Sequence, residues 1–138
     1  MDKQELPQIS DKLGAKAGPY RESVPPSRIE AFYRSVGVTP RLEAPPTFMT
    51  VFRKGEFELF ERLGIPLARV LHGEQEYEYE EPIRGGDTVT YECELVKALE
   101  KRGSKGQMLF MTFDTEATIE REGRKLRAGR TRCTVVVK

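Results

Sequence analysis

The stretch from Leu109 to Glu120 constrains the fold of this chain more than any other part of its sequence. Apolar or small side chains occupy every second position, and the positions between them are polar from Thr112 onward. The first set consists of Leu109, Met111, Phe113, Thr115, Ala117 and Ile119. A period of two places alternate side chains on opposite faces of a β-strand. We therefore expect a strand here that presents one face to the core of a sheet.

Other strands are predicted on both sides of this one. Val89 to Leu95 alternates in the same way, and Leu126 to Val137 is expected to form the last strand. Lys101 to Gly106 is a polar turn with two glycines, and Glu122-Gly123 is typical of a hairpin turn. Tyr20 to Val24 could add a short first strand. Together these segments predict a β meander in the second half of the chain.

A strand, a turn and a second strand are also predicted from Leu71 to Val89. Tyr77 and Tyr79 alternate with Glu76, Glu78 and Glu80, so the tyrosines share one strand face and the glutamates the other. Pro82 cannot donate a hydrogen bond to a sheet and should end the strand. Gly85-Gly86-Asp87 then supplies the residue types that a tight reversal of the chain needs.

Two helices are expected before the meander. The first should cover Ser27 to Val36, with Ser27 and Glu30 spaced as a capping box. The second should cover Thr47 to Leu63, although Gly55 in its middle predicts either a break or close packing of helix against sheet. Val38 to Pro46 contains three prolines and no period, so it is expected to be a loop.

The order of these elements predicts an α+β domain in which an antiparallel sheet wraps around one central helix, Thr47–Leu63. We expect a single domain over residues 20–138, because 138 residues suit one core. Residues 1–19 are mixed in charge and have no period. They are predicted to be a flexible N-terminal arm or a segment that wraps a neighbour.

Charge and cysteine content limit the classes of partner. A formal net charge of +1 gives no reason to expect nucleic acid or a membrane. Cys93 and Cys133 are not part of a metal-ligand spacing, so no metal site is expected, and two buried free thiols are favoured over a disulfide. No apolar run is long enough to span a bilayer, and the first residues are too polar for a signal peptide. The expected location is the cytoplasm.

Several short motifs resemble those of a known family. They are Leu71-His72-Gly73-Glu74-Gln75, then Pro82-Ile83 and Gly86-Asp87, with Ala44-Pro45-Pro46-Thr47-Phe48 upstream. In wording and spacing the chain resembles the N-terminal type of MaoC-like dehydratase, also called the FAS1-like dehydratase domain, of the hotdog-fold hydratases. The resemblance implies a hotdog fold with Thr47–Leu63 as its central helix. It also implies (R)-specific hydration of 2-enoyl thioesters or dehydration of 3-hydroxyacyl thioesters, carried on coenzyme A or acyl carrier protein and without another cofactor.

The chain departs from the catalytic members of that family at one point. Those members resemble one another in an Asp-x-Asn-Pro-x-His stretch after the first helix, whose aspartate and histidine act as general acid and base. The corresponding stretch here is Gly37-Val38-Thr39-Pro40-Arg41-Leu42, which keeps the proline but has neither acid nor base. We therefore expect no catalytic residue in this chain. The favoured role is a subunit that shapes the acyl site and pairs with a catalytic hotdog subunit.

Two residues remain as weak catalytic candidates. His72 is the only histidine and could be a relocated base, but a structural place at the start of a strand is favoured. Asp87 could be a general acid, but it more often satisfies backbone N–H groups of its own turn.

Substrate contacts are predicted at two places. Phe48, Met49 and Phe52 could line an acyl tunnel, with core packing as the default alternative. Arg124, Arg130 and Arg132 belong to a basic run whose guanidinium groups could bind the phosphates of coenzyme A. Strand alternation would place Arg130 and Arg132 on one face and Arg127 on the other.

Two other functions stay open at the level of the sequence. The chain could be a non-catalytic acyl-CoA-binding or structural hotdog homodimer. It could also be a hotdog thioesterase, which would need a carboxylate on or near the central helix, and Glu56 and Glu58 are the candidates. All three functions share one expectation, a homo- or heterodimer, because a lone hotdog sheet leaves an exposed edge that needs covering.

Overall fold

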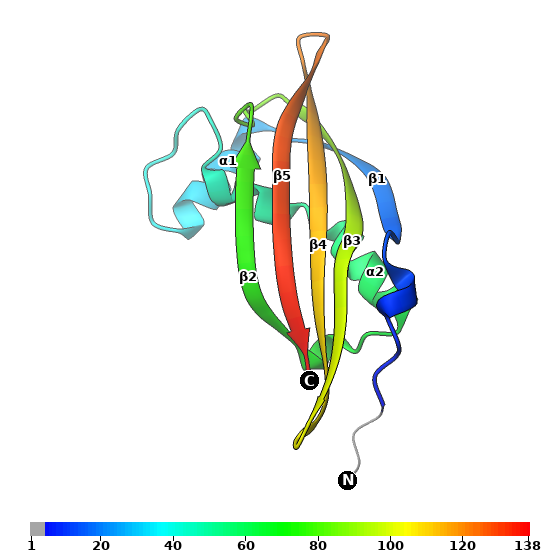
Figure 1. Ribbon diagram of the computed structural model, residues 1–138. Helices are drawn as coiled ribbons and strands as arrows, with labels where there is room; N and C mark the ends of the chain where they lie inside the picture. The colour runs from blue at the N-terminus through cyan, green and yellow to red at the C-terminus, as the bar shows by residue number, and fades with distance from the viewer. Residues whose placement is uncertain (1–4) are drawn as a thin grey trace.

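The computed structural model describes residues 5–138 and consists of a five-stranded antiparallel sheet that curves around helices on one side (Figure 1). The strand order in the sheet is β1-β3-β4-β5-β2. The strands are β1 (Lys16–Ser23), β2 (Val70–Tyr79), β3 (Thr88–Gly103), β4 (Gly106–Arg121) and β5 (Arg124–Val137). The α-helices are α1 (Pro26–Ser35) and α2 (Lys54–Leu63), and short 3-10 helices cover Ser10–Lys12, Pro46–Val51 and Leu67–Arg69. The predicted meander and its two hairpins are confirmed.

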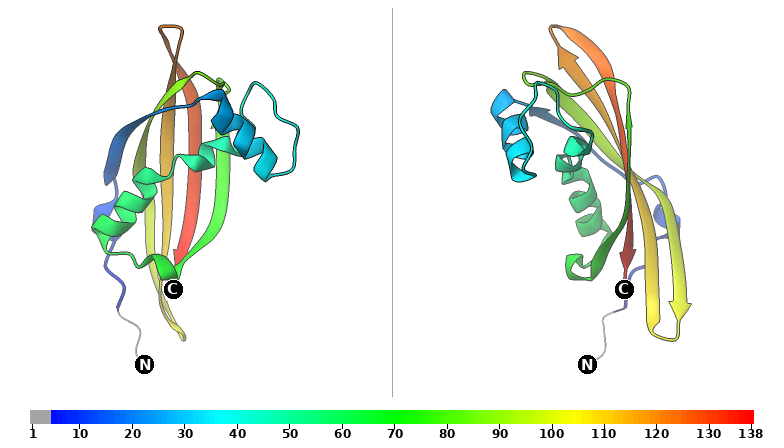
Figure 2. Two further views of the ribbon diagram at one scale, coloured as in Figure 1. Left: turned by 180° about the vertical axis from the view of Figure 1, so that it is seen from behind. Right: turned by 90° about the vertical axis from the view of Figure 1, so that its left-hand side faces the viewer.

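The central helix lies against the inner face of the sheet, but it is not continuous (Figure 2). The predicted helix Thr47–Leu63 is in fact a 3-10 helix, Pro46–Val51, followed by α2, with Phe52 and Arg53 between them. The break therefore falls before Gly55, whose predicted close packing against the sheet is confirmed. A Cβ atom at Gly55 would lie 2.4 Å from the Cβ of Cys93 on β3, so only glycine allows this approach.

Helix α1 differs from the prediction at its start. The helix begins at Pro26 and Pro25 is the N-cap, with no capping hydrogen bond from a side chain. The capping box of Ser27 and Glu30 is therefore wrong: proline is favoured in the first turn because its missing N–H would have no partner there, and it moves the start one residue upstream. Ile29 and Tyr33 are buried as the helical period predicted.

The expected flexible arm is packed against the sheet in its described part, residues 5–19; residues 1–4 lie outside the described residues. Leu6 and Ile9 are buried in the core, and β1 begins at Lys16 instead of Tyr20. The backbone N–H groups of these two residues donate to side chains of Gln107 and Glu100. Two buried aliphatic side chains give the segment a reason to stay on the sheet, which its mixed composition concealed.

The space between sheet and helices holds two apolar clusters. One surrounds α2 and includes Leu59, Phe60 and Phe113, and the other lies beneath α1 and includes Phe48 and Phe52. Cys93 and Cys133 are both buried free thiols, as predicted. No helix within residues 5–138 is long and apolar enough to cross a membrane.

The outer face of the sheet carries charged side chains, and one of them, Arg127, was predicted to lie on the other face. Arg127 shares the outer face with Arg130, because the register between β4 and β5 shifts between Ala117 and Thr118. The shift requires Gly129: its φ is +148°, and a Cβ there would lie 1.9 Å from the carbonyl oxygen of Glu78. A β-bulge of this kind inserts one residue and reverses the alternation beyond it. The sequence-based placement of Arg127 on the opposite face is therefore wrong.

Candidate functional site

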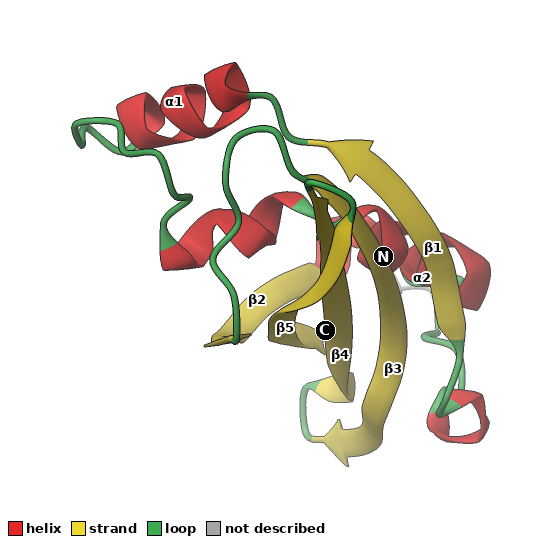
Figure 3. Cartoon of the chain, turned by 90° about the horizontal axis from the view of Figure 1, so that it is seen from above, coloured by secondary structure: helices red, strands yellow, loops and turns green. Residues whose placement is uncertain are grey.

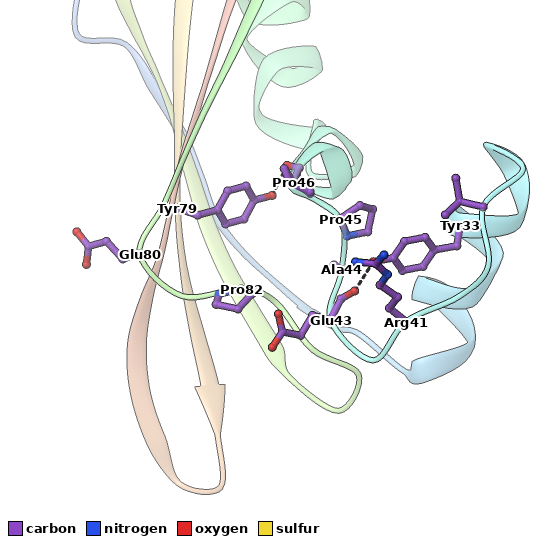
Figure 4. Close-up of a pocket in the computed structure, with 10 residues that line it drawn as sticks. Tyr33, Arg41, Glu43, Ala44, Pro45, Pro46, Tyr79, Glu80 and Pro82 are labelled. Carbon is purple, nitrogen blue, oxygen red and sulfur yellow. Dashed lines mark hydrogen bonds between the residues drawn. The ribbon is translucent and has the colours of Figure 1, made fainter.

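One hollow in the molecule lies between the loop after α1 and the end of β2. Its volume is about 580 Å³. The lining residues are Tyr33, Val38, Arg41, Glu43, Ala44, Pro45, Pro46, Tyr79, Glu80 and Pro82. Figure 4 shows the loop from Arg41 to Pro46 facing the segment from Tyr79 to Pro82 across this pocket. Figure 3 shows that α1 and this loop lie together on the side of the sheet that the helices cover. The pocket is therefore built by irregular segments that a sheet and a helix hold in place.

Three hydrogen bonds fix the two walls. The hydroxyl group of Tyr33 donates to the carbonyl oxygen of Glu43 at 2.6 Å, which ties the loop to α1. The hydroxyl group of Tyr79 donates to the carbonyl oxygen of Pro46 at 2.5 Å, which ties β2 to the start of the 3-10 helix. The backbone N–H of Ala44 donates to the carbonyl oxygen of Ile83 at 2.7 Å, which ties the loop to the segment after β2. The rings of both tyrosines thus form apolar parts of the pocket wall, because their hydroxyl groups are hydrogen-bonded to backbone carbonyl oxygens.

The charged groups of the pocket are two carboxylates and one arginine at its rim. Glu43 pairs with Arg84 at 3.0 Å, and Glu80 pairs with Arg127 at 2.6 Å. Arg41 is exposed and lies beside Tyr33 in Figure 4. Prolines, Ala44 and Val38 form the rest of the surface. An apolar hollow with a few charges at its mouth suits a ligand with an apolar chain and a polar end.

The chemistry available in this pocket is limited. Val38 and Arg41 of the stretch Gly37–Leu42 line it, so the segment that corresponds to the Asp-x-Asn-Pro-x-His stretch does border the pocket. Burial raises the pKa of the Tyr79 phenol well above its ordinary value, so this group stays protonated at neutral pH. No histidine lines this pocket, and the guanidinium group of Arg41 offers hydrogen-bond donors but no acceptor. The walls of this pocket therefore offer no matched acid and base.

Asp87 lies outside the pocket and is held in a buried ion pair. Arg121 donates to both of its carboxylate oxygens, each at 2.8 Å, and the backbone N–H of Arg84 donates at 2.8 Å. Arg121 also donates to Glu81 and to the carbonyl oxygen of Pro82. The hydrogen bonds to Asp87 raise the pKa of Arg121 above its ordinary value. All these bonds stabilise the turn, which matches the structural reading of Asp87.

His72 and the two helix carboxylates lie away from the pocket. His72 is exposed on β2 and its Nε2 atom is 3.0 Å from Oε1 of Gln75. Glu56 is buried, and its carboxylate accepts a hydrogen bond from Arg53 at 2.9 Å. Glu58 is exposed and accepts from Tyr20 and Arg62. The structure brings none of the three to the walls of the 580 Å³ pocket.

The predicted substrate contacts fall outside this pocket as well. Phe48, Met49 and Phe52 are buried in the cluster beneath α1, which is the core packing held as the alternative. Arg130 and Arg132 lie on the outer face, where Glu78 and Asp114 pair with them. Arg124 is exposed beside a smaller, polar hollow of about 300 Å³ that Arg84 and Arg121 also line. Contact of these residues with a substrate stays a prediction.

Sequence reasoning missed Glu43, Tyr33 and Tyr79 as lining residues. Glu43 directly follows the stretch Gly37–Leu42, so a search extended by one residue would have found it. The tyrosines had no such signal, because each was already explained as the apolar face of a helix or strand. Within residues 5–138 no group of three or more histidine, cysteine, aspartate or glutamate side chains could hold a metal ion.

Comparison with solved structures places this architecture among MaoC-like dehydratases and hydratases. One subunit of the HadBC (3R-hydroxyacyl-ACP dehydratase) complex of Mycobacterium tuberculosis superimposes with a TM-score of 0.74 at 16% identity, over 94% of this chain and 99% of that one. The (R)-hydratase of A. caviae gives 0.57 at 18% identity, over 89% and 94%. These likenesses confirm the hotdog fold. Several of the neighbours are complexes or oligomers.

Sequence relatives cover less of the chain. A UPF0336 protein of Streptomyces griseus is 44% identical over 61 residues, and one of Mycobacterium tuberculosis is 32% identical over 68 residues. Each match spans 41% of the relative's length. The family model for the FAS1-like dehydratase domain region matches residues 30–127, which is most of the chain. The chain therefore belongs to the FAS1-like dehydratase domain family, as its HGEQ, Pro-Ile and Gly-Asp motifs indicated.

Proposed function

We propose that this chain is the acyl-site-shaping subunit of an (R)-specific 2-enoyl-thioester hydratase or 3-hydroxyacyl-thioester dehydratase. A partner hotdog subunit would supply the aspartate and histidine. One observation carries the proposal: the 580 Å³ pocket is bordered by Val38 and Arg41 of the stretch Gly37–Leu42, which corresponds to the Asp-x-Asn-Pro-x-His stretch of catalytic relatives and has neither its aspartate nor its histidine. The chain thus keeps the hollow and lacks the proton-transfer pair. A hollow of this size accommodates an acyl chain.

The edge of the sheet supports a partner. β2 pairs with β5 on one side only, so its other side has backbone groups free to pair with another strand. Such an edge needs covering. Two structural neighbours are two-component complexes, HadBC and ChsH1-ChsH2 of Mycobacterium tuberculosis. We therefore infer a heterodimer, and the cytoplasm remains the proposed location.

The proposal is tested by reconstitution. The lone chain, assayed with trans-2-enoyl thioesters, should show no turnover near that of a working hydratase, because losing a positioned acid or base costs about 10²–10⁴-fold for each role. Adding a hotdog subunit that carries Asp-x-Asn-Pro-x-His should restore turnover. Fast turnover by the lone chain that His72→Ala abolishes would make His72 the base and overturn the proposal.

A second function follows if reconstitution fails. The missing acid–base pair is equally compatible with an acyl-CoA-binding or structural homodimer without lyase activity. Sedimentation of the lone chain separates the two: a stable homodimer that binds acyl thioesters, and that gains no turnover with any catalytic subunit, would favour this second function.

A further inference from the structure

The outer face of the sheet, turned away from α2, carries an apolar row near the C-terminus. Leu71 on β2, Val136 on β5, Phe110 on β4 and Leu99 on β3 are consecutive cross-strand partners. Leu71 and Leu99 are each 52% exposed, and the two residues between them are half-buried. Cross-strand partners share one face, so the four side chains form a single line. Contiguous exposed apolar groups of this kind mark interaction sites more often than single ones do.

The surroundings of this row are cationic. Lys97 and Lys101 flank Leu99 at two residues on either side along β3, and Lys138 lies two residues after Val136. The ammonium group of Lys101 lies 5.1 Å from the ring centroid of Phe110. Within residues 5–138 these three lysines have no carboxylate partner. Glu100 is adjacent to Leu99 but points to the opposite face, where it accepts a hydrogen bond from Ile9. Glu74, opposite Thr134 on the edge strand, is therefore the nearest acidic residue of the register on the outer face.

The rest of the outer face looks different. Arg127, Arg130 and Arg132 are all neutralised by carboxylates of neighbouring strands. Three lysines without a carboxylate partner therefore lie beside the apolar row, whereas these three arginines farther along β5 are already paired. This distribution calls for a partner that is apolar along a line and negative on either side of it.

We propose that this row docks an acidic amphipathic α-helix of a partner protein. The row crosses four strands, so it is about 14 Å long. That length matches about ten residues of α-helix, whose i, i+3, i+4, i+7 side chains form a stripe of the same shape. Glutamates on both sides of that stripe would face the lysines.

Two other occupants fit less well. A second copy, packed face to face about a two-fold axis centred on the row, would bring the lysines against the same lysines. A membrane surface would need apolar and basic groups spread over a plane, whereas here they form one line of four side chains. The row lies on the opposite side of the sheet from α2, so docking there leaves the 580 Å³ pocket free.

The test uses a synthetic helical peptide of about 14 residues, with leucines at i, i+3, i+4 and i+7 and glutamates elsewhere. Titrated into the isotope-labelled full chain, it should shift the amide resonances of Leu71, Leu99, Phe110 and Val136. The double variant Lys97→Glu/Lys101→Glu should weaken binding at least about tenfold. The control variant is Lys125→Glu, because Lys125 is exposed on β5 at the other end of the sheet. This variant should change the affinity for the peptide less than about twofold.

A second peptide and three further measurements can contradict the proposal. A peptide with lysines in place of the glutamates should not bind, and equal binding of both peptides would remove the charge argument. Shifts outside the row, or no shifts, would show that the row is not a helix-docking site. Binding of the chain to anionic vesicles but not to the peptide would assign a membrane surface. A fall in oligomer mass in Leu71→Ser/Leu99→Ser would assign a second copy.

Discussion

Two carboxylates touch the same arginine, Arg84, and their surroundings differ in almost every respect. Asp87 is 1% exposed and accepts three hydrogen bonds of 2.8 Å, two from Arg121 and one from the backbone of Arg84. The Glu43 side chain is 49% exposed and accepts one hydrogen bond from the Arg84 side chain at 3.0 Å. The first carboxylate is fully occupied in holding a turn, and the second lies at the rim of a pocket. Burial and pairing, and not residue type, separate the structural acid from the accessible one.

The strand register explains why Asp87 is so well held. Thr88 is opposite Glu120, so the turn before β3 meets the end of β4, where Arg121 lies. The guanidinium group of Arg121 reaches both oxygens of Asp87 and also Glu81. The loop that holds Glu43 is tied down by an isolated bridge to Arg84 and by single hydrogen bonds from Tyr33 to Glu43 and from Ala44 to Ile83, and the Glu43 carboxylate itself stays half-exposed. The turn is therefore the more rigid of the two regions.

The largest expected effect is on stability at the buried acid. Asp87→Ala leaves the Arg121 charge without its main partner and should lower the free energy of unfolding by about 3–5 kcal/mol. Glu43→Ala removes a half-exposed ion pair and should cost no more than about 1 kcal/mol. Urea unfolding of both variants measures the difference. Equal losses would show that the two regions are not distinct in the way described.

Filling the pocket should affect binding and spare the fold. Ala44→Phe places a ring among the walls and should weaken acyl-CoA binding by at least about tenfold, which corresponds to about 1.4 kcal/mol. Thr47→Phe is the matched control, because Thr47 is exposed and does not line the pocket. Calorimetric titration with octanoyl-CoA gives both affinities. If the control weakens binding as much as Ala44→Phe, the acyl chain lies elsewhere.

Glu43 itself should matter little for catalysis. In the reconstituted enzyme, Glu43→Gln should change kcat less than about threefold, because removing a true general base would cost about 10²–10⁴-fold. The amide keeps the size of the side chain and its contact with Arg84. A fall in kcat of about 10²–10⁴-fold, with an unchanged melting temperature, would instead assign proton transfer to Glu43.

A further effect, on stability at alkaline pH, is expected at Tyr79. Burial raises the pKa of this phenol in the folded chain, so its contribution is fully present below the ordinary tyrosine pKa of about 10 and falls as the pH rises above it. Tyr79→Phe removes this proton linkage and one hydrogen bond to Pro46. The variant should be about 1 kcal/mol less stable at pH 8, and the gap should narrow above about pH 10. Urea unfolding at both pH values measures the gap, and a gap that widens would contradict the assignment.

Most of the sheet could be predicted from the sequence, because side-chain alternation is a local property. Met111, Phe113 and Ile119 lie in the core as their period indicated. Exceptions to local rules were harder to foresee. The bulge at Gly129 depends on a backbone contact with β2, about fifty residues away in the sequence. The break before α2 and the burial of Leu6 and Ile9 likewise depend on tertiary packing.

The site was less predictable than the fold, for a physical reason. Its walls are a loop without a period and the end of a strand, and neither has an internal pattern that gives its place in space. The absence of an acid–base pair in Gly37–Leu42 could be read directly. The hydrogen bond from Tyr79 to Pro46 could not be predicted from the sequence, because this contact depends on how β2 lies beside the 3-10 helix.

One pair of measurements on the lone chain tests the central claim, that the pocket holds an acyl thioester but cannot transfer its protons. Calorimetric titration with octanoyl-CoA is paired with a hydration assay on trans-2-octenoyl-CoA at the same protein concentration. We predict saturable binding, weakened by Ala44→Phe, together with no detectable hydration. Hydration at the rate of a working hydratase, or the absence of any binding that Ala44→Phe reduces, would contradict the account.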